Sequence, residues 1–262
     1  WVHLPDFLSA AEVEAALNAR PQQLPLQFVR QEPQLGTGHA VQQAQPVLPD
    51  DGLVVVLSGD VPLITAATLS RLVQACQGEC LALLTVCPAD PTGYGRVVRN
   101  GSGQVQAIVE QKDANEAQLA IGEVYSGIMA APTRLLRAWL SRLDNRNAQA
   151  EYYLTDVVAK AVADGVTVQA ILCDDLAQVA GVNSPAQLAE LERIHQRRQA
   201  EQLMAQGVRL LDPSRFDLRG ELTCAADVQI DVNCVFAGRV VLGEGVQIGA
   251  HCVLSDCHIE AG

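Results

Sequence analysis

LVVVLSGDVP, residues 53–62, joins an apolar run to a polar end and indicates the class of fold. The run LVVVL is short, uninterrupted and rich in β-branched residues, which is typical of a strand buried on both faces of a parallel sheet. Ligands of open α/β sheets gather at the carboxyl ends of strands, and Asp60 stands at such an end. A carboxylate there can hold Mg²⁺ against phosphate oxygens; the alternative is an aspartate that only forms a turn or a cap.

Strands and helices alternate on both sides of this run. Upstream, LQFV at residues 26–29 is a short strand candidate, and the GTG triplet behind it is more typical of a turn than of a phosphate loop. We expect His39 at a helix start rather than in catalysis. Downstream we predict a helix capped by Thr65 that runs to residue 77, a strand at 81–86, a polar hairpin at 95–113, helices at 132–143 and 155–165, and a strand at 166–172. This order predicts an α/β sheet with an antiparallel excursion.

The pattern of apolar and polar residues changes at Ser184. Residues 184–207 predict a long connecting helix, because four apolar residues mark one face of an otherwise polar stretch that ends at Gly207: Leu188, Leu191, Ile194 and Leu203. Beyond it, two apolar series recur every six residues, namely Val228, Cys234, Val240, Val246 and Cys252, and Ile230, Phe236, Leu242, Ile248 and Leu254. Interleaved six-residue series predict short strands that end in tight turns around one axis, as in a parallel β-helix.

The dipeptides HC at 251–252 and CH at 257–258 bring together residue types that zinc prefers. Cys252, however, belongs to the inward six-residue series, and adjacent residues of a strand point to opposite faces. We therefore expect its sulfur to be a small apolar filler rather than a metal ligand.

Composition excludes several classes of function. The net charge is −12 and the chain has only two lysines, so sequence-independent binding to nucleic acid or to an anionic membrane is not expected. No apolar run approaches the roughly 20 residues of a membrane span. The eight cysteines are scattered without a CxxC pair, which favours reduced, buried thiols and a cytoplasmic protein.

Taken together, the motifs resemble those of a known family. QLGTGHA, LSGDVPL, DPTGYGR, IVEQKDA, AQAEYYLTD and GVN occur in this order ahead of the six-residue repeat. This closely resembles the bifunctional bacterial family of N-acetylglucosamine-1-phosphate uridyltransferases and glucosamine-1-phosphate acetyltransferases. The resemblance covers practically the whole chain. It implies an incomplete Rossmann-like nucleotidyltransferase domain at residues 1–183, a linker helix at 184–207 and the start of a left-handed parallel β-helix at 208–262.

The resemblance also implies a site. Gln31 and the backbone of Gly36 would read the uracil edge of UTP with Thr37 beside them, and Ser58, Gly59 and Asp60 would lie under the nucleotide. Gly95 and Glu110 would bind N-acetylglucosamine 1-phosphate. Asp60 and Asn183 would hold Mg²⁺. Outside the family, Gln31 could be a polar strand end, Glu110 a solvated hairpin residue and Asn183 the N-cap of the linker helix.

Three departures from the family pattern bear on activity. The Gly-rich loop with Arg and Lys that wraps the phosphates has no counterpart in this chain, so we expect the 262 residues alone to be a fragment that turns over UTP poorly. EVYSGI carries Tyr125 where the family has an amide that touches the sugar. The six-residue repeat spans about two coils, so acetyl-CoA binding and the acetyltransferase residues are expected only in the complete protein, as a homotrimer.

Two other readings stay open. Nucleotidyltransferases for other sugar 1-phosphates, such as glucose 1-phosphate, also carry β-helix tails. A noncatalytic scaffold homologue is the second alternative, for which the missing loop and Tyr125 would speak. The joint presence of Asp60, Glu110 and Asn183 favours an enzyme.

Overall fold

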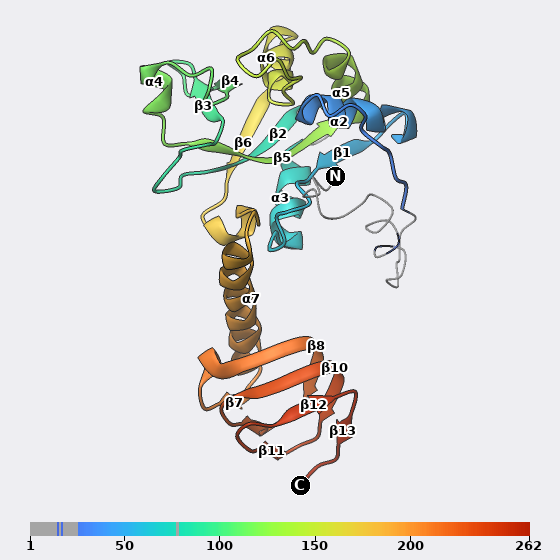
Figure 1. Cartoon of the computed structure of the whole chain (residues 1–262), viewed down its shortest axis with the longest axis vertical. Coiled ribbons are helices and arrows are strands. Elements are labelled where there is room, and N and C mark those ends of the chain that lie inside the picture. Colours follow the sequence, from blue (N-terminus) through green and yellow to red (C-terminus); the bar gives the residue numbers. More distant parts are fainter. Residues whose placement is uncertain (1–14, 16, 18–25, 77–78) are drawn as a thin grey trace. The chain divides into compact units, whose positions relative to one another are not determined.

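The computed structural model describes residues 15, 17, 26–76 and 79–262, and the chain divides into two compact units, Trp1–Gly181 and Val182–Gly262. The first unit is a mixed α/β domain and the second combines one long helix with short strands (Figure 1). Among the described residues, no helix combines the length and the apolar character that crossing a membrane requires.

The first unit is built on a six-stranded sheet in the order β4-β3-β5-β2-β6, with β1 paired to β5. Its strands are β1 (Leu53–Val56), β2 (Leu81–Val86), β3 (Arg96–Arg99), β4 (Val105–Val109), β5 (Val124–Pro132) and β6 (Val168–Leu172). Its helices are α2 (Thr37–Ala44), α3 (Ala66–Cys76), α4 (Glu116–Leu119), α5 (Thr133–Leu140) and α6 (Asp156–Ala163), with 3₁₀ turns η1 (Gln45–Val47) and η2 (Leu176–Val179). The predicted α/β class and the predicted hairpin, β3 and β4, are confirmed.

Strand β5 was not predicted, and it organises the sheet. It pairs antiparallel with β1, β2 and β3, whereas β2 and β6 pair in parallel. The expectation that LVVVL lies in a parallel sheet is therefore wrong, because β1 runs antiparallel to β5 from Leu53 opposite Pro132 to Val56 opposite Met129. The pattern of β5 is broken at Gly127, which has a φ of 87° and lies where the register of β2 against β5 shifts.

Both faces of this sheet are covered by helices. All of β2 is buried, and its side chains alternate between two apolar clusters. Leu81 and Leu83 join the cluster that contains Trp139 of α5 and Val157 of α6. Ala82, Leu84 and Val86 join the cluster that contains Leu72 of α3. A strand buried on both faces reads as a continuous apolar run, which is why β2 was predictable.

Local signals set the helix boundaries. The Thr65 hydroxyl accepts the backbone N–H of Thr68 at 3.2 Å, so the predicted cap of α3 is confirmed. The helix ends at Cys76, and the predicted last residue, Gln77, lies outside the described residues. Gly165 follows α6 with a φ of 74°, as expected of a glycine that ends a helix.

The predicted strand at residues 26–29 is wrong. This segment has no regular structure, and Leu26 and Phe28 are 44% and 42% exposed. None of the described strands pairs with it, so its apolar side chains have no sheet in which to be buried.

The second unit begins with helix α7, Pro185–Ala205. Ser184 caps it by accepting the N–H of Gln187 at 3.2 Å. The predicted apolar face is only partly buried: Leu191 and Leu203 are covered, but Leu188 and Ile194 are exposed. The polar Gln196 is buried instead, because its amide donates to the carbonyl of Leu218 and accepts the N–H of the same residue.

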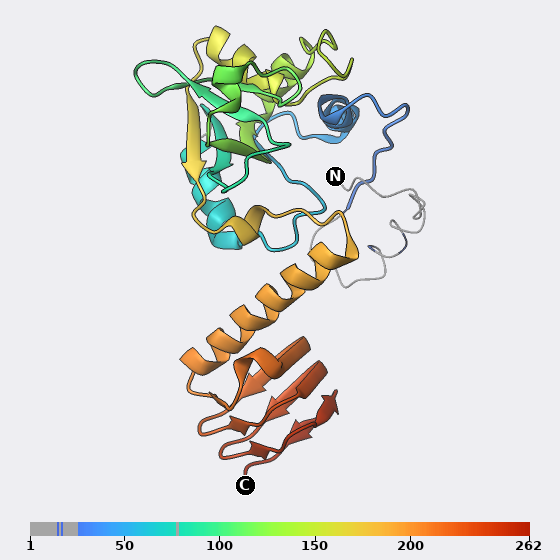
Figure 2. The ribbon, with the colours of Figure 1, turned by 60° about the vertical axis from the view of Figure 1, so that its left-hand side comes forward.

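Short parallel strands follow α7 in two sheets, stacked in layers (Figure 2). They are β7 (Arg209–Leu210), β8 (Phe216–Cys224), β9 (Gln229–Ile230), β10 (Cys234–Leu242), β11 (Gln247–Ile248), β12 (Val253–Ser255) and β13 (His258–Ile259), with the 3₁₀ turn η3 at Pro213–Arg215. Both six-residue series point into one apolar cluster, as predicted. Cys252 packs against that cluster, in agreement with the expected apolar filler.

Glycines allow two strands of this unit to approach closely. Gly220 of β8 lies opposite Gly238 of β10 in the parallel register. A Cβ on Gly220 would collide with the backbone of Gly238, and a Cβ on Gly238 would collide with the side chain of Asp256. The three residues therefore form a column, here called the glycine column, that has no room for another atom.

Candidate functional site

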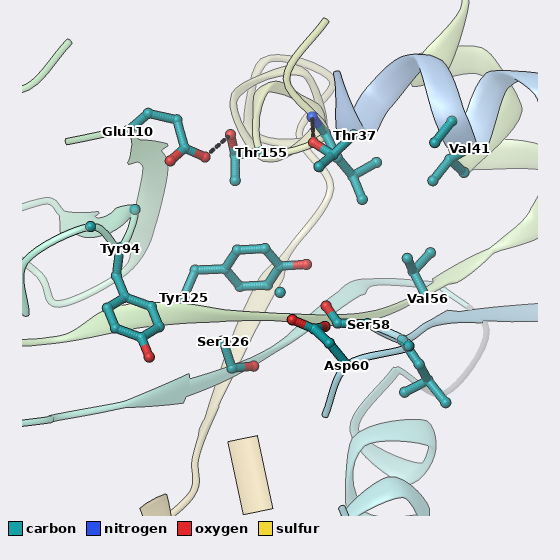
Figure 3. Close-up of a pocket in the computed structure, with 17 residues that line it drawn as sticks. Thr37, Val41, Val56, Ser58, Asp60, Tyr94, Glu110, Tyr125, Ser126 and Thr155 are labelled. Carbon is teal, nitrogen blue, oxygen red and sulfur yellow. Dashed lines mark hydrogen bonds between the residues drawn. The ribbon is translucent and has the colours of Figure 1, made fainter. Parts of the chain in front are cut away.

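The first unit contains a pocket of about 360 Å³ beyond the end of β1. Figure 3 shows its side chains converging from several elements. The lining comprises Thr37, Ala40 and Val41 of α2, residues 56–60 after and at the end of β1, residues 93–95 before β3, Glu110 after β4, residues 125–127 of β5, and Leu154 and Thr155 before α6. Six of the nine residues expected at a site lie in this lining: Thr37, Ser58, Gly59, Asp60, Gly95 and Glu110.

Asp60 lies in the loop that follows β1, as expected from the sequence. Within the part of the chain that the structure describes, its carboxylate has neither a hydrogen bond nor an ion pair to another residue. Ser58 comes close to β5 because Gly127 has no side chain; a Cβ there would lie 2.9 Å from the Ser58 hydroxyl oxygen. The missing Cβ thus keeps the start of the Asp60 loop close against the sheet.

Helix α2 forms one wall of the pocket and begins directly after Gly36. The Thr37 hydroxyl accepts the N–H of Leu154 at 3.1 Å, and the N–H of Gly38 donates to the carbonyl of Tyr152 at 2.7 Å. His39 is the third residue of this helix, so the prediction of a helix start is confirmed.

Gln31 and Gly36 lie together but outside the pocket lining. The Gln31 amide donates to the Gly36 carbonyl at 2.9 Å and contacts the ring of His39 at 3.2 Å. The other amide atom, Oε1, is buried and has no hydrogen-bond partner among the described residues. Buried acceptors normally have a hydrogen-bond donor, so this oxygen is suited to accept a hydrogen bond from a ligand.

Gly95 and Glu110 form the opposite wall. A Cβ on Gly95 would lie 2.6 Å from the side chain of Ile108, so only glycine fits beside β4 at this position. The Glu110 carboxylate accepts a hydrogen bond from the Thr155 hydroxyl at 2.9 Å (Figure 3). Burial raises the pKa of Glu110, an effect that the Thr155 hydrogen bond opposes and that the nearby carboxylates of Asp156 and Asp113 reinforce.

Asn183 belongs to the second unit. Its backbone N–H donates to the Gln187 side chain at 2.8 Å, and the residue that caps α7 is Ser184. The alternative reading of Asn183 as the N-cap is therefore wrong, since it precedes the cap by one residue. Its role as a metal ligand stays a prediction.

Sequence reasoning missed several residues of the lining. Tyr94 and Ser126 stand next to Gly95 and Tyr125, for which the family resemblance has an expectation, but no role is predicted for them or for Thr155 of AQAEYYLTD. Its hydrogen bond to Glu110 joins positions 45 residues apart, which no local pattern signals.

Tyr125 is the departure from the family pattern that lies inside the pocket. Its ring lies between the Glu110–Thr155 pair and the residues Ser58 and Asp60 (Figure 3). The side chain is 7% exposed, and its hydroxyl is buried without a partner among the described residues. Burial, together with the charge of Glu110, raises the pKa of Tyr125 well above its ordinary value, so the phenol stays neutral.

Replacing Tyr125 with phenylalanine is expected to leave the free energy of unfolding unchanged or to raise it by about 1 kcal/mol, because the change removes a buried hydroxyl without a partner. Urea unfolding of the two proteins measures the difference. Ser126→Ala is the matched control, because its hydroxyl donates to the carbonyl of Leu84 at 2.8 Å and its loss should destabilise. A clear loss of stability in Tyr125→Phe would show that the phenol has a partner in the unliganded protein.

Comparisons with known proteins show the family to which the chain belongs. A family model described as "MobA-like NTP transferase domain" matches residues 6–210. The chain is 64% identical, over 97% of its length, to the "Bifunctional protein GlmU" of Acidovorax ebreus (strain TPSY), and 67% identical, again over 97%, to the protein of the same name from Polaromonas naphthalenivorans (strain CJ2). It covers 56% and 55% of these two proteins, so the chain spans about half the length of the curated relatives it matches. The resemblance drawn from the sequence motifs is confirmed.

Proposed function

Because the chain belongs to the MobA-like NTP transferase domain family, we propose that its pocket is the nucleotidyl-transfer site of a protein that makes UDP-N-acetylglucosamine from UTP and N-acetylglucosamine 1-phosphate. The observation that carries the proposal is the meeting of Asp60, Thr37, Gly95 and Glu110 around one pocket at the end of β1. These residues come from four separate segments of the chain. Together they would supply what the reaction needs: a metal ligand, a contact to the nucleotide and contacts to the sugar.

Asp60 is the proposed protein ligand of Mg²⁺. Its carboxylate faces the pocket and makes no bond to the described residues, so its oxygens are available. No group of three His, Cys, Asp or Glu side chains gathers for a metal in the described ranges, and this fits Mg²⁺, which commonly takes one or two protein oxygens and completes its shell with phosphates and water. When bound, the ion neutralises phosphate charge. Asn183 is the second proposed ligand.

Two regions suit different parts of the product: the residues beside the start of α2, which lie outside the pocket lining, and the pocket wall that carries Glu110. Near Gln31 and Gly36, the buried acceptor Oε1 of Gln31 matches a donor such as the uracil N–H. Near Gly95, the Glu110 carboxylate is an acceptor that matches sugar hydroxyls and repels phosphate. We therefore place the nucleobase beside α2 and the sugar beside Glu110.

The proposed reaction links the nucleotide to the sugar phosphate. A phosphate oxygen of the sugar phosphate attacks the α-phosphorus of UTP, a new P–O bond forms, and the bond to the β-phosphate breaks to release pyrophosphate. The chain's own part is to hold the two substrates in line, through Gln31 and Thr37 at one end and Glu110 at the other. Such a reaction depends on positioning and charge neutralisation, so no general base among the lining residues is required.

We further propose that the second unit is the start of a left-handed parallel β-helix joined by α7 as the linker helix, with domains at 1–183, 184–207 and 208–262. The support is the six-residue spacing of its inward residues and its parallel pairing. Acetylation of glucosamine 1-phosphate with acetyl-CoA, and trimerisation through the β-helix, are proposed for the complete protein.

Binding of the product tests the proposed function. With Mg²⁺ present, calorimetry should detect binding of UDP-N-acetylglucosamine and competition by UTP, and UDP-glucose should bind more weakly. Equal binding of both sugar nucleotides would favour a different sugar phosphate as the substrate. Absence of binding by either would favour the scaffold reading and contradict the proposal.

Glu110→Gln is expected to separate stability from sugar binding. The pKa of Glu110 is raised in the folded chain, so folding favours the protonated form and the charged form costs stability near neutral pH. The variant should therefore unfold at higher urea near pH 7, and this gain should shrink as the pH falls through the raised pKa of Glu110. UDP-N-acetylglucosamine should bind on the order of tenfold more weakly to the variant, because a charged acceptor is lost. A variant that binds the sugar nucleotide as well as the parent would remove Glu110 from the sugar site.

A further inference from the structure

Arg96, the first residue of β3, is buried in an unusual way. The residue is 2% exposed, yet none of the described carboxylates forms an ion pair with it. One guanidinium nitrogen donates to the carbonyl of Tyr94 and another donates to the side-chain oxygen of Gln111 at 3.2 Å. The third nitrogen, Nε, is buried without a partner among the described residues. The pKa of Asp90 is lowered by hydrogen bonds from Thr92 and, to a smaller extent, by the charge of Arg96, so one carboxylate acts on the guanidinium without contacting it. Burying a guanidinium without a contacting counterion is costly, so stability alone would favour an apolar residue at this place.

Gln111 completes the arrangement from the turn that follows β4. The same side-chain oxygen that accepts from Arg96 also accepts the backbone N–H of Gly93. Gln111 directly follows Glu110, at the end of β4. Arg96 and Gln111, here called the Arg96–Gln111 clamp, therefore tie both Gly93 and Tyr94 to the strand end that carries Glu110.

Within the described part of the chain, the segment held by this clamp has few other hydrogen bonds. Gly93 and Tyr94 are exposed, and Gly93 has a φ of 88°. Apart from the clamp, Tyr94 donates its N–H to the carbonyl of Pro91 at 3.3 Å. Gly95, in contrast, is buried and its carbonyl accepts the N–H of Tyr125 at 2.9 Å. The pocket wall at 93–94 thus depends on Arg96 and Gln111 for its position.

We infer that Arg96 is a positioning residue for the sugar part of the substrate, because its bonds to Tyr94 and Gln111 hold residues 93–95 beside Glu110. The inference rests on the proposed function for the identity of the sugar. Arg96 does not line the pocket, so it acts through the segment it holds.

Gln111→Ala tests the clamp with little risk to folding, since Gln111 is only half-buried. Arg96→Lys is the second variant, which keeps the charge but cannot reach both acceptors in the same geometry. Gln106→Ala is the matched control, because Gln106 is a half-buried glutamine of β4 whose amide, among the described residues, donates to the carbonyl of Val105 and to no other group. Hydrogen exchange of the free protein follows the amides of residues 93–95, and calorimetry follows UDP-N-acetylglucosamine and UTP.

Both clamp variants should exchange the Gly93 amide faster by about tenfold or more, since its acceptor is lost or loosened, while Gln106→Ala should not. Both should weaken UDP-N-acetylglucosamine by about tenfold and leave UTP unchanged. Unchanged exchange, or equal losses for both nucleotides, would overturn the inference. If exchange accelerates but the parent protein binds no sugar nucleotide, the clamp stands as a structural fact and the proposed function fails instead.

Discussion

Asp60→Asn is expected to lower nucleotidyl transfer by the complete protein by about 10²- to 10³-fold, because it removes the carboxylate proposed to hold Mg²⁺ against the phosphates. The amide keeps the size of the side chain but is a much weaker ligand for a hard cation. Pyrophosphate release with UTP, N-acetylglucosamine 1-phosphate and a series of Mg²⁺ concentrations measures the effect. The Mg²⁺ needed for half-maximal rate should rise as well.

Asp174→Asn is the control for this prediction. Asp174 is an exposed aspartate just after β6 that does not line the pocket. Its replacement by asparagine changes the net charge of the protein by the same amount as Asp60→Asn. We expect its rate and its Mg²⁺ dependence to match the parent protein. An Asp60→Asn variant with near-normal rate would show that Asp60 is only a turn residue.

Gly220→Ala is expected to cost the second unit about 3 kcal/mol of unfolding free energy or more, which is among the largest effects of a single methyl group. The added carbon would overlap the backbone of Gly238 in the paired strand, and backbone atoms of a hydrogen-bonded ladder cannot move aside singly. Urea unfolding followed by circular dichroism measures the loss. A stability close to that of the parent would contradict the close approach of β8 and β10.

At Gly238, the second residue of the glycine column, the loss of stability caused by an added Cβ can be rescued by a second substitution, whereas at Gly220 it cannot. A Cβ on Gly238 would overlap the Asp256 side chain, which can be removed. Asp256→Gly suits the φ of 46° at that position but gives up the bond to the N–H of Arg239 at 3.0 Å. The double variant Gly238→Ala with Asp256→Gly should recover most of the loss of Gly238→Ala, with about 1 kcal/mol remaining for alanine at a φ of 62°. Simple addition of the two single losses would argue against direct contact.

The contrast between β2 and β5 shows what local sequence can predict. LALLTV is apolar at nearly every position and therefore reads as a strand without further information. VYSGIMAAP is equally buried, but Ser126 and Gly127 interrupt its pattern, and only its three partner strands explain why it is extended. Pairing is a long-range property, so the antiparallel setting of β1 could not be predicted from its own residues.

The residues of the candidate site likewise include some that local sequence predicts and some that it does not. Asp60 could be predicted as a candidate from its place after an apolar strand, because strand ends collect ligands in this class of sheet. Gly95 and Glu110 were named only through resemblance to a family. Thr155 and the Arg96–Gln111 clamp needed the tertiary structure, since their partners lie on other segments.

The buried side-chain amide of Gln196 in α7 makes the pair of hydrogen bonds that the backbone of a neighbouring strand would make. It donates to the carbonyl of Leu218 and accepts its N–H, the two groups that β8 turns away from β10. An open sheet edge with such groups unpaired is a template on which other chains add strands and aggregate. Helix α7 therefore satisfies the edge groups of β8 at Leu218 with the side-chain amide of Gln196, to which Gln199 adds a longer bond to the same carbonyl, so these groups are not offered to another chain.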